Sequence, residues 1–129
     1  MSRQVTTERA IIALSDDEIL SFRYVPGAIV DLDFARGLIA EAREFLGDGV
    51  PRPTTVEPGD VKGLTREARA YFAESPEMRV VSSSVALIVD SPAARIIGNV
   101  FLRVSKPELP TKLFTDGDAA RAWLRTNPR

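Results

Sequence analysis

The sequence of 129 residues contains neither cysteine nor histidine. The absence of cysteine excludes disulfides, thiolate catalysis, iron–sulfur clusters and thiolate zinc sites. The absence of histidine excludes Ser-His-acid triads and imidazole metal ligands. Any catalysis would have to rest on carboxylate, lysine, tyrosine or serine chemistry, so we expect a protein that is not an enzyme and that holds no metal or other cofactor.

The sequence has no large excess of either charge, because it contains 17 Lys and Arg residues and 18 Asp and Glu residues, which gives a net charge of −1. Proteins that bind nucleic acids or anionic membranes depend on a concentrated field of Lys and Arg, whereas the charges here are scattered singly. Long hydrophobic runs are also missing, since residues 10–14 and 85–89 have only the length of strands. We therefore expect a cytoplasmic protein, a single domain over residues 1–129, with no nucleic-acid or membrane partner.

The first half of the chain shows a strand pair followed by a helix. Residues 9–14 and 18–25 are rich in β-formers and flank the polar cluster Ser-Asp-Asp, which predicts an antiparallel hairpin. Apolar residues then recur at three-to-four spacing over 32–46, so we expect a helix capped by Asp31 and ended by Gly47.

Strands and helices alternate from there on. Residues 52–57 predict a weak strand, in which Pro53 favours a sheet edge or a distorted start. A helix over 66–75 with Thr65 as its cap leads into the strand 80–90, whose apolar second half indicates burial on both faces.

The clearest helix start is the Ser-Pro pair at residues 91–92, which predicts a helix over 92–104. A short strand over 111–115 and a last helix beginning at Asp116 complete the order β-β-α-β-α-β-α-β-α. The predicted fold class is α/β, with an N-terminal hairpin, a mixed and mostly parallel sheet, and helices packed on it that leave one face partly open.

The helix over 92–104 has more apolar residues than one stripe can bury. Its expected inner face consists of Ala93, Ile97, Val100, Phe101 and Val104. Ile96 and Leu102 lie off that stripe, and Gly98 between them would let a neighbouring helix approach closely. The pattern predicts a homodimer through Ile96, Gly98 and Leu102.

Several segments resemble a known family. These are SPAARIIGN at residues 91–99, PTKLFT at 110–115 followed by 120–124, and YVPG at 24–27 leading into 31–33. Together they resemble a bacterial family of uncharacterised small proteins with a STAS-like fold, the fold of anti-sigma-factor antagonists. The resemblance spans nearly the whole chain and implies the same fold, while fold alone does not imply a function.

In the antagonists, a serine in an Asp-Ser-Ser-Gly motif at the start of the second helix is phosphorylated, and its charge blocks a kinase partner. Here Thr65 occupies the position of the Asp, and Arg66 and Glu67 occupy those of the serines. The motif is absent, so we expect binding that does not depend on phosphorylation. Thr65 remains a candidate regulatory residue, and the alternative is a plain helix cap.

Two further candidates lie in loops or strands. Glu57 and Asp60, with Asp90, could gather carboxylates at the sheet edge for a hard cation, and the alternative is simple loop solvation. The family has an Asp-Ile-Arg-Gly-like segment where this chain has VEPGD at 56–60. The serines at 82–84 could place hydroxyls in a pocket, where an activated serine would need a lysine partner.

These observations favour a non-enzymatic regulatory or protein-interaction module that forms homo-oligomers and has a possible protein partner. The alternative is a small-molecule or lipid-binding domain of the wider STAS and CRAL-TRIO-like superfamily, with an apolar pocket between the open sheet face and the helices. An enzyme comes third.

Overall fold

The computed structural model describes residues 2–126. The strands of its main sheet are β1 (Arg3–Thr6), β2 (Ala10–Leu14), β3 (Leu20–Tyr24), β5 (Arg52–Glu57), β7 (Ser82–Ile88) and β8 (Thr111–Phe114). The helices are α1 (Leu32–Leu46), α2 (Arg66–Glu74), α3 (Met78–Val81), α4 (Pro92–Val100) and α5 (Gly117–Thr126), and the π-helical turn η1 (Phe101–Ser105) continues α4. The strand order is β1-β2-β3-β5-β7-β8, and two short parallel strands, β4 (Ile29–Val30) and β6 (Gly63–Leu64), pair separately.

The predicted hairpin is confirmed, because β2 and β3 pair antiparallel with Ile12 opposite Phe22. In β2 the residues Ala10, Ile12 and Leu14 are buried in alternation, as expected of a strand packed on one side. The N-terminal residues 3–6 form a further strand, β1, which pairs antiparallel with β2. The sequence did not predict β1, because all four of its residues are exposed and show no apolar alternation.

β5 lies at the centre of the sheet, where it pairs in parallel with β3 and with β7. The expectation of an edge position was therefore wrong, while the distorted start is confirmed by a register shift between Arg52 and Pro53. Proline cannot donate a ladder hydrogen bond, and the irregularity accommodates it. The charged residue before it is buried and paired, since Arg52 contacts Asp48 at 2.6 Å and Glu18 at 3.1 Å.

β7 begins at Ser82, two residues later than predicted, because residues 78–81 form the short helix α3. The turn is built by backbone bonds from Met78 N–H to Ser75 C=O and from Arg79 N–H to Pro76 C=O, both 3.1 Å long. β-branched residues such as Val81 favour a strand locally, and here tertiary packing overrides that preference.

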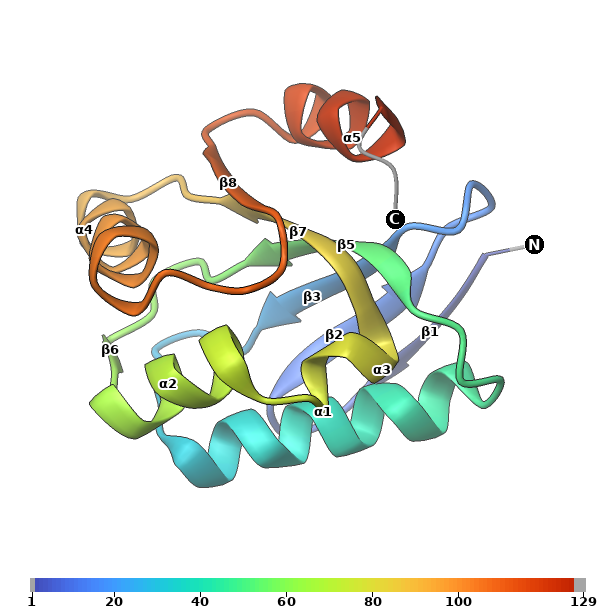
Figure 1. Cartoon of the computed structure of the whole chain (residues 1–129), viewed down its shortest axis with the longest axis horizontal. Helices are drawn as coiled ribbons and strands as arrows, with labels where there is room; N and C mark the ends of the chain where they lie inside the picture. Colours follow the sequence, from blue (N-terminus) through green and yellow to red (C-terminus); the bar gives the residue numbers. More distant parts are fainter. Residues whose placement is uncertain (1, 127–129) are drawn as a thin grey trace.

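Three connections join parallel neighbours: β3 to β5 through α1, β5 to β7 through α2 and α3, and β7 to β8 through α4. Right-handed crossovers that advance in one direction across a sheet place their helices on the same face. The fifth helix, α5, lies on the opposite face (Figure 1), where Ala120 and Leu124 pack with Ile19 and Ala86. The residues of β2 and β3 that alternate with the buried ones, Ile11, Ala13, Ser21 and Arg23, are half-buried or exposed, so this face is partly open.

The helix caps expected from the sequence are confirmed. The hydroxyl or carboxylate oxygens of Asp31, Thr65 and Ser91 accept the backbone N–H three residues further on, at 2.8, 3.2 and 3.1 Å, at the starts of α1, α2 and α4. Gly47 ends α1 with a φ of 73°, a left-handed conformation that favours glycine.

The inner face of α4 differs from the predicted one. Ala93, Val100 and Val104 were assigned to it, yet all three are exposed. Leu102, expected outside, is half-buried, whereas Ile96 is exposed as expected.

Gly98 explains the rotation of this helix. It is buried where α4 comes closest to the sheet, and a Cβ added to it would lie 2.6 Å from Cδ1 of Leu113. With apolar residues around most of the helix, periodicity alone cannot select a face, and the close approach at glycine does so. The buried positions are therefore Ala94, Gly98 and Phe101.

Candidate ligand pocket

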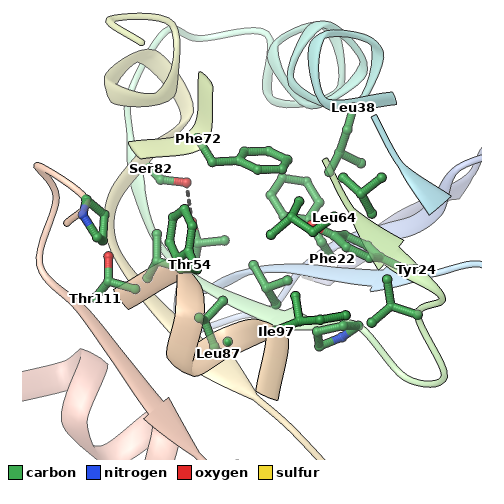
Figure 2. A pocket seen from close by; sticks show the side chains of 18 of the residues that line it. Phe22, Tyr24, Leu38, Thr54, Leu64, Phe72, Ser82, Leu87, Ile97 and Thr111 are labelled. Atoms are coloured by element: carbon green, nitrogen blue, oxygen red, sulfur yellow. Dashed lines mark hydrogen bonds between the residues drawn. The ribbon is translucent and has the colours of Figure 1, made fainter. Parts of the chain in front are cut away.

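A pocket lies on the helix-covered side of the sheet, with β3, β5 and β7 as its floor and α1, α2 and α4 around it. Figure 2 shows its side chains converging from these elements on a common space. The interior volume is about 80 Å³, and the whole space including its opening to solvent is about 850 Å³. An engineered cavity of about 150 Å³ binds benzene, so this narrower interior admits only a slender group unless its walls move.

Apolar side chains form nearly the whole lining. They include Phe22 and Val56 from the floor and Phe72, Ile97 and Phe101 from the helices. No Asp, Glu, Lys or Arg lines the pocket within the described part of the chain. The environment therefore favours neutral groups and penalises buried charge.

The helices over the pocket are tied at both ends. The N–H of Glu108 donates to the C=O of Ala73 at 2.9 Å, and Arg79 forms an ion pair with Glu108. At the other end, the Ser91 hydroxyl donates to the C=O of Gly59 at 3.4 Å. These contacts hold α4 and η1 in place around the opening.

Two hydroxyls in the floor satisfy each other. Thr54 Oγ1 lies 2.7 Å from Ser82 Oγ, as the dashed line in Figure 2 marks, and both residues are buried. Because Thr54 donates to the C=O of Arg52 at 2.9 Å, its partner Ser82 must be the donor of the shared bond. Neither hydroxyl has a proton left for a ligand.

Tyr24 contributes a phenol hydroxyl to the lining (Figure 2). Its ring packs edge-to-face on Phe34, with centroids 5.4 Å apart. Enclosure by apolar side chains raises the pKa of Tyr24 well above its ordinary value, so the phenol stays neutral. Among the described residues, the hydroxyl of Tyr24 has no hydrogen-bond partner.

Residues 12–127 match the model of a family described as a domain of unknown function, DUF7793. The chain belongs to this family. A search of curated proteins gave no match. The family assignment therefore places the chain among uncharacterised proteins, as the motifs at 91–99 and 110–115 predicted, and it names no activity.

Two solved structures are similar to the chain. One is an uncharacterised protein of the DUF3478 family with a SpoIIAA-like fold from Shewanella loihica PV-4, which shares 17% identity with a TM-score of 0.56 over 95% of this chain and 93% of that one. The other is a protein of unknown function from Arthrobacter sp. FB24, at 29% identity and a TM-score of 0.37 over 95% and 98%. The first likeness confirms the predicted SpoIIAA-like, or STAS-like, fold.

Of the candidate polar residues from the sequence, Ser82 lines the pocket, whereas Thr65, Glu57 and Asp60 lie outside it. Thr65 caps α2, which is the plainer of its two interpretations. Glu57 pairs with Arg23 at 3.3 Å, and Asp60 accepts the N–H of Gly27 at 2.7 Å. Within residues 2–126, no three acidic side chains gather as a metal site, and none of the helices is long and apolar enough to cross a membrane.

The residues expected at a dimer interface are separated by the structure. Ile96 is exposed on the outer side of α4, but Gly98 packs against the sheet and Leu102 is half-buried. Gly98 therefore cannot contact a second copy, because Leu113 already occupies the space beside it.

The sequence did not single out the pocket residues. Tyr24 was not a candidate, and of the serines at 82–84 considered for a pocket only Ser82 lines it. One signal was present, since a tyrosine on an otherwise apolar strand face needs a partner for its hydroxyl when buried.

Proposed function

We propose that this domain is a non-enzymatic binding module that takes up a slender, apolar small molecule in the pocket beneath α2 and α4. The observation that carries the proposal is a free interior space with a lining that is almost wholly apolar. Protein interiors are normally packed to the density of organic crystals. Ligand sites are typically concave and apolar with a few polar groups, and this pocket has that composition.

A binding role is favoured over catalysis by the chemistry of the lining. The shared bond between Ser82 and Thr54 occupies the serine proton, and no base lies against it. No carboxylate or amine of residues 2–126 lines the pocket, and the raised pKa of Tyr24 keeps its phenol protonated. Nucleophilic or general acid–base chemistry needs a group with an accessible pKa.

The regulatory role expected from the fold can be exerted through α4. One side of this helix lines the pocket with Ala94 and Ile97, while its other side exposes Ile96 and Val100. A ligand that shifts α4 would therefore change a surface that a partner can contact. The helix couples the interior of the domain to its exterior.

A chain-length series tests the proposed function. Isotope-labelled protein is titrated with neutral straight-chain 2-ketones of increasing length while backbone amide signals are recorded. Each buried CH₂ contributes about 0.8 kcal/mol, so the Kd should fall about fourfold per carbon until the pocket is full. Saturable shifts should centre on Phe72 and Ile97. Shifts spread over the surface, or a Kd insensitive to length, would refute the proposal.

A second function, self-association, is favoured by the outer face of α4 and η1. Ile96, Val100 and Val104 are 65%, 38% and 66% exposed and follow one another at four-residue spacing. Across a two-fold axis they would supply six apolar side chains. The homodimer thus stays a prediction, with Val100 and Val104 replacing Gly98 and Leu102 beside Ile96 in the interface.

A further inference from the structure

The hydroxyl groups that line the pocket differ in whether they are free to donate a hydrogen bond to a ligand. Thr111 donates to the C=O of Leu109 at 2.9 Å, and Thr54 and Ser82 are satisfied as described. Tyr24 is the exception, because its hydroxyl has no protein partner in the described part of the chain and, unlike the buried unpartnered hydroxyls of Ser83 and Ser84, keeps accessible surface that a ligand can reach. A tyrosine in an apolar setting normally places its hydroxyl on an acceptor.

The lining also limits the charge of the ligand. Among the described residues that line it, there is no cation to pair with a carboxylate or phosphate and no anion to pair with an ammonium group. Burying an unpaired charge is far more costly than burying a hydrogen-bonded neutral group. The part of the ligand that enters must be uncharged.

We propose that the ligand is a slender neutral hydrocarbon that carries one hydrogen-bond-accepting oxygen, such as a carbonyl, and that Tyr24 donates its hydroxyl proton to that oxygen. This inference rests on the proposed function and specifies the class of molecule. The apolar remainder of the ligand lies between Phe72 and Ile97, which project from opposite sides of the pocket (Figure 2). The charged heads of fatty-acid anions and amines are excluded from the same space.

A double-mutant cycle between protein and ligand tests this contact. The ligand pair is 2-heptanone and 2-methyl-1-heptene, in which a C=CH₂ group replaces the carbonyl at nearly the same shape. The protein pair is wild type and Tyr24→Phe, which removes the hydroxyl and keeps the ring. The control variant is Tyr71→Phe, because that hydroxyl donates to Glu77 at 2.9 Å and does not line the pocket.

The expected result is that Tyr24→Phe weakens the ketone relative to the alkene by about fivefold, the usual size of one neutral hydrogen bond. Tyr71→Phe should leave the ratio unchanged. Octanoate at pH 7 should bind at least tenfold more weakly than 2-heptanone.

The outcomes separate this inference from the proposed function. If both ligands bind wild type and the ratio does not respond to Tyr24→Phe, the hydrogen bond is wrong and the pocket stands. If octanoate binds as tightly as the ketone, the neutral ligand class is wrong. If neither neutral ligand binds, the proposed function fails as well.

Discussion

Replacing Ala94 with leucine would fill the pocket from the wall of α4. Ala94 is 1% exposed and lines the cavity, whereas its neighbour Ala93 is exposed to solvent on the same helix. Burying three more carbon atoms contributes about 2.4 kcal/mol, and fixing the leucine rotamer costs about 0.5–1 kcal/mol. The expected net gain is about 1.5 kcal/mol, which raises Tm by roughly 5 °C in a chain of this length.

The assay combines thermal unfolding with the ketone titration. Ala94→Leu should raise Tm and abolish ligand binding, while Ala93→Leu should change stability by less than about 0.5 kcal/mol and leave binding intact. Inserting carbon atoms into a filled core instead costs about 1–3 kcal/mol. A lower Tm for Ala94→Leu, with ketone binding retained, would therefore refute the idea that this space is free to receive a ligand.

Three further predictions concern other parts of the fold. Arg52 donates to Asp48 and holds the pKa of that carboxyl well below its usual range. Because the folded-state pKa is depressed, this contribution to stability is present above about pH 4 and is lost as the pH falls further. Denaturation curves of wild type and Asp48→Asn should therefore converge toward pH 2. Ile96→Glu should abolish any dimer in sedimentation at micromolar concentration while leaving Tm unchanged, and a wild type that is monomeric at all concentrations would contradict the predicted homodimer. Thr65→Ala should cost about 1 kcal/mol through loss of the α2 cap without affecting ketone binding, and stoichiometric phosphate on Thr65 in cells would overturn phosphorylation independence.

The sequence predicted elements well where a local rule was decisive. The Ser-Pro pair at 91–92 and the cap at Asp31 mark helix starts through short-range hydrogen bonds, so the structure reproduces them. The parallel order of the later strands followed from helical connections between them.

Prediction failed where a distant contact was decisive. β1 forms because a neighbouring strand offers its edge, and nothing in four exposed residues, three of them polar, signals that edge. The face of α4 depends on Leu113, which lies against Gly98 from a strand fifteen residues further along the chain.

The sequence offered an apolar pocket only as an alternative, and the residues that line it could not be predicted for the same reason. Its lining comes from β3, β5, α1, α2, β7 and α4, and each apolar residue looks like ordinary core when taken alone. A cavity forms where such side chains leave space between them, and the spacing of apolar residues in the sequence does not predict where that happens. The role of Tyr24 as a hydrogen-bond donor to a ligand can be inferred only when the groups around its hydroxyl are known.

Xenon is the most direct probe of a free apolar space between the sheet and α4, because xenon enters apolar cavities without needing any hydrogen bond. A crystal of the wild-type protein is pressurised with xenon and compared with a crystal of Ala94→Leu. We expect a xenon atom among Phe72, Ile97 and Leu87 in wild type and none there in the variant. A wild-type crystal with xenon elsewhere and none between the sheet and α4 would contradict it.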